Sequence, residues 1–304
     1  MLDRRLIFVT GKGGVGKSTV AHAIGRLGAR QGKRVIVAEL APAGSGAGID
    51  EVQLSPGLFS IVIDPQAAME EYLRVKAGTL GGALSHSRLF STLAMATPGL
   101  RELLGMGKIW ELAQLQRRTR DGAVYDLVVV DAPATGHGVA ALRTPRVFAQ
   151  TARVGPIAYQ ADIIASTLAD PDFTAIVAVS VAEEMPVRET LSLADALAAD
   201  GLGLDRVVLN QVYPERFTPA ELERIRAAAG GLDPTAEALR SLRSALAAAL
   251  SAQARARSQQ SHARELVDRF GERLAPLPFL FCDELGDAEL DRLADLLEPK
   301  LTLP

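Results

Sequence analysis

The sequence predicts an α/β fold with a doubly wound, mainly parallel sheet. Short runs rich in β-branched and apolar residues alternate with longer helix-patterned stretches, as in successive strand–helix–strand units. Most of these runs are apolar throughout, which is typical of strands covered on both faces. The predicted strands are residues 6–10, 34–40, 58–63, 125–131, 175–180, 206–210 and 277–281.

Two longer segments interrupt this alternation and are expected to be helical additions. The first, residues 66–119, is leucine-rich and is expected to break into short helices at Gly81-Gly82 and Pro98-Gly99. The second, residues 234–274, has a partly helical stripe of leucines. Since no linker, charge run or repeat divides the chain, we expect a single domain over residues 1–304.

The composition is that of an ordinary soluble globular protein. Of the 304 residues, 48% are hydrophobic and 23% are charged, with a formal net charge of −3. A general nucleic-acid binder would be more basic, so no nucleic-acid partner is expected. The first apolar run, residues 6–9, is too short for a signal-peptide core or a membrane span, so a cytoplasmic location is expected.

A glycine-rich loop, residues 11–19 (GKGGVGKST), separates the first strand from the first helix. Strand, loop and helix in this order are typical of a P-loop, in which backbone N–H groups and the helix dipole bind phosphate. A glycine turn beside an exposed lysine is the structural alternative, but the complete motif in its context favours an ATP site. The expected phosphate-binding residues are Gly13, Gly14, Val15, Gly16, Lys17, Ser18 and Thr19. Of these, Lys17 would reach the β- and γ-phosphates and Ser18 would bind Mg²⁺.

Asp131 ends the strand 125–131, and a carboxylate at such a strand end is placed to hold a magnesium-bound water. Lys12 follows the first loop glycine, from where it could extend toward a phosphate bound by a partner subunit. This second lysine resembles the deviant Walker A of dimer-forming ATPases, in which the matching lysine crosses the dimer interface. A solvated loop lysine is the alternative. Lys12, Lys17 and Asp131 are the catalytic candidates.

The run Asp131-Ala132-Pro133-Ala134-Thr135-Gly136-His137 resembles the DTAPTGH signature of the arsenical-pump and tail-anchored-protein-targeting ATPases, with alanine and proline in the other order. Residues 96–102 and 183–190 resemble further segments of that family, although 183–190 also fits a helix start with Pro186 in the first turn. Within the family, residues 154–162 and 186–190 resemble most the bacterial, single-domain anion-transporter-ATPase-like proteins. The resemblance implies a P-loop NTPase fold with helical elaborations.

Two more pairs of residues match the adenine pocket of this family. Asn210 and Gln211 end a strand, and the resemblance implies that the asparagine contacts the base. Pro278 and Phe279 fall where the family's last strand leads into a loop that packs on adenine. A turn-capping role is the alternative for Asn210.

One catalytic position departs from the family pattern. In the pumps and targeting factors of the family, the first switch reads TDPAHS, and its aspartate positions the attacking water. This chain has Ala41 where that aspartate would be. Glu39, two residues earlier, and Asp50, nine residues later, are possible substitutes. Because positioning supplies most of phosphoryl-transfer catalysis, we expect hydrolysis to be weak or partner-dependent.

The single cysteine excludes the thiolate sites of the family. Cys282 alone supports neither a metalloid site nor a CxxC zinc site, so no zinc is expected, and Cys282 is predicted to be buried. In the targeting ATPases, helices near residues 66–119 form a groove for a hydrophobic client. At ordinary helical spacing, core or dimer contacts are the favoured role here.

The resemblance therefore implies an ATP- and Mg²⁺-binding ATPase that acts as a homo- or heterodimer with a homologous subunit. Its partner would be a membrane protein or a hydrophobic client. The alternative is a nucleotide-dependent scaffold or regulatory subunit with negligible hydrolysis, active in a heterodimer. A partition or septum-placement ATPase is disfavoured by the sequence of residues 131–137 and by the missing basic surface.

Overall fold

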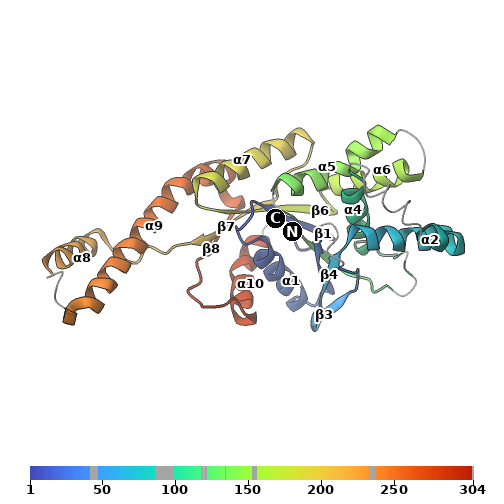
Figure 1. Cartoon of the computed structure of the whole chain (residues 1–304). Helices are drawn as coiled ribbons and strands as arrows, with labels where there is room; N and C mark the ends of the chain where they lie inside the picture. Colours follow the sequence, from blue (N-terminus) through green and yellow to red (C-terminus); the bar gives the residue numbers. More distant parts are fainter. Residues whose placement is uncertain are drawn as a thin grey trace.

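A computed structural model of the chain describes residues 1–41, 47–85, 99–117, 119, 122–133, 135–152, 156–232 and 237–302 (Figure 1). In these ranges eight strands form one sheet in the order β3-β4-β2-β5-β1-β6-β7-β8. Every neighbouring pair is parallel except β3 and β4, which are antiparallel. The predicted α/β fold with a mainly parallel sheet is confirmed, whereas the single-domain organisation remains a prediction.

The strands lie close to their predicted positions, with two differences. The last strand covers Leu274–Pro278 rather than residues 277–281, because pairing with β7 begins where Leu274 lies beside Val207. A short edge strand was not predicted; it forms a hairpin through Pro56-Gly57, where Gly57 has φ +78°. The strands are β1 Leu6–Gly11, β2 Val35–Leu40, β3 Val52–Ser55, β4 Leu58–Ile63, β5 Leu127–Asp131, β6 Thr174–Val181, β7 Arg206–Val212 and β8 Leu274–Pro278.

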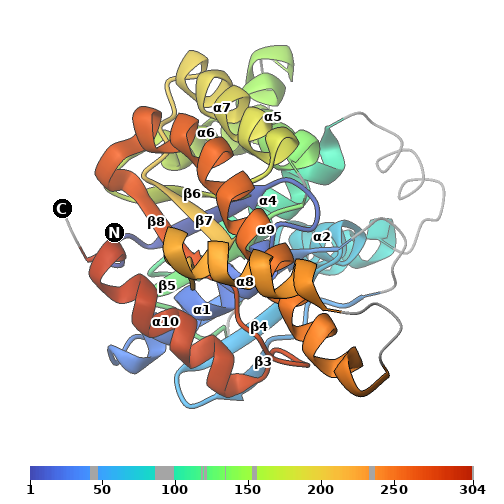
Figure 2. The same ribbon diagram turned by 90° about the vertical axis from the view of Figure 1, so that its left-hand side faces the viewer.

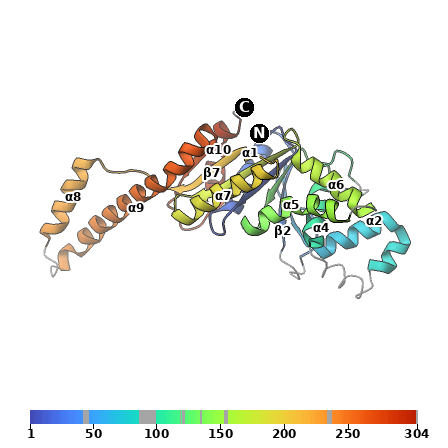
Figure 3. The ribbon, with the colours of Figure 1, turned by 90° about the horizontal axis from the view of Figure 1, so that it is seen from above.

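The helices include both expected additions. Helix α2 continues through Gly81-Gly82, so the predicted break there is wrong; the helix i→i−4 bonds tolerate glycine at a modest cost. The segment 234–274 is dominated by one long helix, α9, which forms a hairpin with α8 beside the sheet (Figure 3). The helices are α1 Lys17–Arg30, α2 Pro65–Ser85, α4 Leu100–Leu112, α5 Thr135–Ala152, α6 Pro156–Ala169, α7 Glu184–Ala199, α8 Pro219–Gly231, α9 Arg240–Phe270 and α10 Asp287–Leu301, with single 3-10 turns at Glu237–Leu239 and Gly271–Arg273.

The sheet separates two apolar cores. Alternate residues of β1 point to opposite faces: Ile7 and Val9 pack under α1 and α10, whereas Leu6 and Phe8 pack under α4, α5, α6 and α7 (Figure 2). This double cover explains why the strand sequences are apolar throughout. The glycine-rich loop follows β1 and therefore lies at the edge of the sheet formed by the carboxyl ends of the central strands.

Two further observations concern the surface. Cys282 lies in the chain after β8 and is exposed, so the prediction that it is buried is wrong; the strand ends at Pro278, before the cysteine can enter the core. Among the helices described here, none is both long and apolar enough to cross a bilayer.

Candidate functional site: a P-loop at the carboxyl edge of the sheet

The loop between β1 and α1 adopts a backbone that requires glycine. Gly11 has φ +147°, and a Cβ built there would lie 2.2 Å from the backbone oxygen of Val179. Gly16, the residue before α1, has φ +92°, and its Cβ would lie 2.4 Å from Asn210 Nδ2. A Cβ on Gly14 would meet nothing within 4 Å, so this part of the loop borders open space. The loop thus leaves room for phosphate beside its N–H groups, as an ATP site requires.

Lys17 and Ser18 occupy the first turn of α1. The ammonium of Lys17 donates a 3.0 Å hydrogen bond to the backbone oxygen of Lys12, which folds the side chain over the loop. Burial lowers the pKa of Lys17, and the nearby Asp131 carboxylate partly opposes this effect. Ser18 is exposed and Thr19 is half-buried. The structure thus brings a cation and a hydroxyl together at a helix N-terminus, where anions are favoured.

Asp131 ends β5 beside this loop and is buried. Its Cα partners are Val9 on β1 and Glu39 on β2. Val9 packs under α1, so Asp131, which shares its register position, lies on the α1 face of the sheet. Carboxylate and hydroxyl oxygens are suitable ligands for Mg²⁺. In the described part of the chain, no three His, Cys, Asp or Glu residues gather as a metal site.

Lys12 is held by its own chain. Its ammonium forms a 2.9 Å ion pair with the Glu189 carboxylate on α7, and both side chains are about one-third exposed. The alternative given for residues 183–190, a helix start, is observed, with Glu183 as the cap and Pro186 in the first turn. Sequence reasoning did not link Glu189 to Lys12, because the two residues are far apart in the chain and no motif joins them.

Asn210 is buried against the loop rather than exposed at the strand end. Its Nδ2 donates to the Val15 backbone oxygen at 2.9 Å, and its Oδ1 accepts from the N–H of Gln211 at 2.9 Å. Gln211 has φ +58°, and its backbone oxygen accepts a hydrogen bond from Gln259 on α9. The asparagine therefore ties β7 to the P-loop; contact of Asn210 and Gln211 with a base remains a prediction.

Pro278 and Phe279 lie at the end of β8, next to the end of β7. The Phe279 ring stacks on Tyr213 with centroids 4.6 Å apart, and Phe281 meets Phe279 edge to face at 4.9 Å. The guanidinium of Arg216 lies 4.4 Å from the centroid of Phe281. Sequence reasoning identified Phe279 but missed Tyr213 and Phe281, which join the cluster through pairing of β7 with β8. Contact of Pro278 and Phe279 with adenine remains a prediction.

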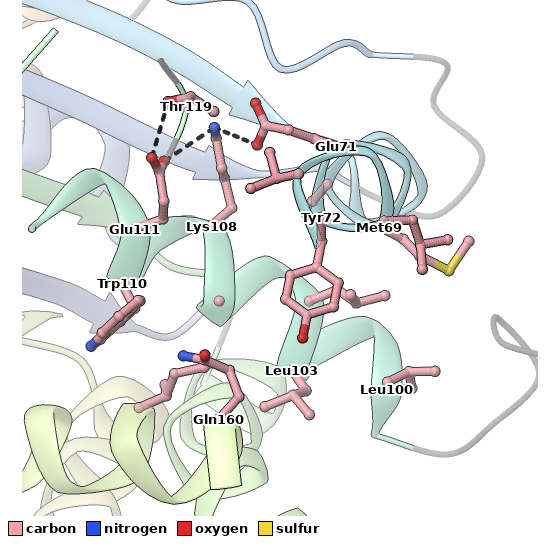
Figure 4. Close-up of a pocket in the computed structure, with 16 residues that line it drawn as sticks. Met69, Glu71, Tyr72, Leu100, Leu103, Lys108, Trp110, Glu111, Thr119 and Gln160 are labelled. Carbon is pink, nitrogen blue, oxygen red and sulfur yellow. Dashed lines mark hydrogen bonds and ion pairs between the residues drawn. The ribbon is translucent and has the colours of Figure 1, made fainter. Parts of the chain in front are cut away.

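A second hollow lies away from the P-loop, between α2, α4 and α6. It is a cavity of about 160 Å³ with mainly apolar walls that include Met69, Leu103 and Ile164 (Figure 4). The Lys108 side chain is almost fully buried at its wall and pairs with Glu71 at 2.6 Å and with Glu111 at 3.3 Å. Other side chains of α4 are buried in the core, as expected: Met106, Ile109 and Leu112.

The first-switch position is only partly within the described residues. Ala41 is nearly buried, and its N–H donates to the Ile63 backbone oxygen at 3.0 Å, which continues the pairing of β2 with β4. Pro42 to Gly46, Ala134, and residues 96–98 of the quoted segment 96–102 lie outside the described residues. His137 falls in the first turn of α5.

Comparison with known proteins identifies the family. The family model described as "Anion-transporting ATPase" matches residues 4–155 and 157–228. The chain belongs to the anion-transporting ATPase family. It is 32% identical to the ATPase BagA of Mycobacterium tuberculosis over 245 residues, which cover 75% of this chain and 71% of that protein.

Two other relatives have names that describe more specific proteins. The arsenical pump-driving ATPase of Escherichia coli is 28% identical over 238 residues, covering 69% of this chain and 40% of the pump ATPase. The ATPase GET3 of Candida glabrata is 25% identical over 256 residues, covering 69% of this chain and 73% of GET3. The family and its ATP-binding character are thereby established for this chain.

Proposed function

We propose that this protein is a dimer-forming ATPase that binds ATP with Mg²⁺ and uses dimer closure to act on a partner or a hydrophobic client. The observation that supports this most strongly is the glycine loop of β1–α1 with Lys17, Ser18 and Asp131 around it. The loop N–H groups and Lys17 would hold the phosphates. Ser18 would bind Mg²⁺ directly and Asp131 through water, and the metal would neutralise charge on the phosphates.

Lys12 supports the dimer in this proposal. Lys12 lies on the loop, but its side chain extends to Glu189 on α7, whereas the Lys17 side chain folds over the loop. When a second copy or a homologous subunit docks, Lys12 would leave Glu189 and reach the phosphates of the partner's nucleotide. Because a cation near the transferred phosphoryl group stabilises the transition state, hydrolysis would then depend on the dimer.

The alanine at position 41 argues for slow turnover. Its methyl group cannot accept a hydrogen bond from an attacking water, and it is nearly buried beside β4. A nucleotide-dependent scaffold with negligible hydrolysis is therefore the second candidate. In that case ATP binding, rather than its hydrolysis, would switch the protein between partners.

An apolar client is the proposed substrate class. The cavity between α2, α4 and α6 has mainly apolar walls, which suit a hydrophobic group. A metalloid client is not supported, because the only cysteine is Cys282 and metalloids are held by several thiolates.

The experiment is steady-state phosphate release from Mg-ATP by the purified chain, together with ATP binding and sedimentation. The control is Lys17→Ala, which removes the phosphate-binding cation. Turnover that this change abolishes would support the ATPase. Binding without turnover would support the scaffold. If the unaltered chain bound no ATP, both functions would be overturned.

A further inference from the structure

Glu39 is an exposed carboxylate at the edge where the P-loop lies. It is the Cα partner of Asp131 on the neighbouring parallel strand, so the two backbones are about 4.8 Å apart. Residues in register on neighbouring strands project to the same face, and the face of Asp131 is the one that α1 covers. In the described residues Glu39 has no ion-pair partner. Its carboxylate thus lies beside Asp131, the residue proposed to hold a magnesium-bound water.

His22 on α1 is close enough to both Asp131 and Glu39 to be affected by their charges. His22 lies one helical turn after Ser18, on the same side of α1. Burial lowers the pKa of His22, while the charges of Asp131 and then Glu39 oppose that effect. Both carboxylates therefore lie on the α1 face of the sheet, as their strand register also indicates.

The other acidic candidate, Asp50, lies elsewhere. It precedes β3, which is three strands away from β5 in the sheet, or about 14 Å across the strands. Its Oδ2 turns back toward its own loop and would be 3.4 Å from a Cβ on Gly48. Asp50 can therefore serve as a matched carboxylate outside the site.

The height of Glu39 along the strand separates its role from that of the missing aspartate. Position 41 is on the same face of β2 as Glu39 but lies two residues further on, or about 6.6 Å beyond it. An aspartate at 41 would project past the sheet edge toward the attacking water. Glu39 lies instead at the level of Asp131, where the waters of the metal are expected.

We propose that Glu39 is a second carboxylate of the magnesium site, which positions metal-bound water together with Asp131 and does not replace the water-orienting aspartate. This inference rests on the proposed ATP binding. The expected chemistry is outer-sphere: the carboxylate accepts hydrogen bonds from waters of Mg²⁺ and adds negative charge near the cation. Glu39 is thus a positioning residue that strengthens metal binding to the nucleotide complex.

The test measures metal binding separately from hydrolysis. ADP is bound to the purified chain, and Mn²⁺, as a paramagnetic substitute for Mg²⁺, is titrated by electron paramagnetic resonance. Nucleotide binding without metal is measured in parallel by calorimetry. The variants are Glu39→Gln, Asp131→Asn as a positive comparison and Asp50→Asn as the matched control.

The expected result is a roughly tenfold weaker Mn²⁺ affinity in Glu39→Gln, in the range that outer-shell ligands typically contribute. Asp50→Asn should leave the affinity unchanged, and metal-free ADP binding should not weaken in Glu39→Gln. Equal Mn²⁺ affinity in the Glu39 and Asp50 variants would overturn the inference, as would an equal loss of metal-free and metal-bound ADP. Failure of the unaltered chain to bind any nucleotide would instead overturn the proposed function.

Discussion

Replacing Arg117 by methionine tests a buried charge network that joins the start of β3 to the cavity helices. The guanidinium is 2% exposed and pairs with Glu51 at 2.7 Å and with Glu111 at 3.0 Å. Glu111 also pairs with Lys108, which reaches Glu71 on α2. The network therefore connects the segment after β2 with α2 and α4, two of the three helices that line the cavity.

The expected cost of Arg117→Met is about 3 kcal/mol of unfolding free energy, at the lower end for removal of one partner from a buried ion pair. The lower end applies because Glu111 keeps Lys108 and Glu51 is partly exposed. With an unfolding entropy of about 2.1 cal/mol/K per residue, this corresponds to a decrease in Tm of about 5 °C for a chain of this length.

The pH dependence gives a second measurement. Burial by itself would raise the pKa of Glu111, but the hydrogen bonds and charges of Arg117 and Lys108 outweigh it and lower the pKa. A carboxyl group with a lowered pKa stabilises the fold above its unfolded value, about 4.3, and loses that contribution as the pH falls through the folded value. In the variant, of these two cations only Lys108 is left to oppose the effect of burial on Glu111. The pKa of Glu111 is therefore higher than in the unaltered protein, and the carboxylate takes up a proton at higher pH. The stability deficit should be largest at pH 7 and narrow on acidification.

The assay is urea unfolding and thermal melting of both proteins between pH 7 and pH 3, a range that extends below the unfolded pKa of Glu111. The matched control is Arg257→Met on α9, which makes the same substitution at an exposed position and should change stability by less than about 0.5 kcal/mol. Equal losses in the two variants, or a deficit in Arg117→Met that does not vary with pH, would refute the argument from the buried network.

Three further outcomes are expected around the P-loop. Gly16→Ala should weaken ATP binding by calorimetry at least tenfold, because its Cβ would lie 2.4 Å from Asn210 Nδ2; Gly14→Ala has open space and should lose less, and an equal loss would contradict the steric argument. Glu189→Gln removes the anionic partner of Lys12 and should strengthen ATP-driven dimerisation, measured by sedimentation, by about two- to fivefold, which corresponds to the free energy expected of a partly exposed ion pair. Weaker dimerisation in this variant would contradict the proposed release of Lys12. Ala41→Asp should raise phosphate release about tenfold or more, since a carboxylate can orient the attacking water; an unchanged rate would show that positioning of water is not limiting.

The P-loop and the cavity between α2, α4 and α6 differ in the kind of residues that form them. Around the P-loop, the glycine conformations and the charges of Lys17 and Asp131 all suit the binding of a phosphate group. The cavity side combines ordinary core packing with a network of ion pairs.

Features that arise within one continuous segment could be predicted from the sequence. Three such features are the β1–loop–α1 unit, the carboxylate at the end of β5 and the start of α7, with Pro186 in its first turn. Each depends on neighbouring residues, so its pattern could be recognised directly. The hairpin strand β3 was missed although Pro56-Gly57 is a turn signal, because its alternating run Val52–Ser55 is only four residues long and its apolar side chains, Val52 and Leu54, are exposed.

Contacts between residues that are distant in the chain could not be predicted in this way and were found in the folded structure. Strand order places Glu39 beside Asp131 and separates Asp50 from both, and the packing of α7 brings Glu189 to Lys12. The same non-local packing buries Asn210 against the P-loop and leaves Cys282 exposed. These contacts depend on how whole strands and helices pair, which the side-chain pattern of a single segment does not encode.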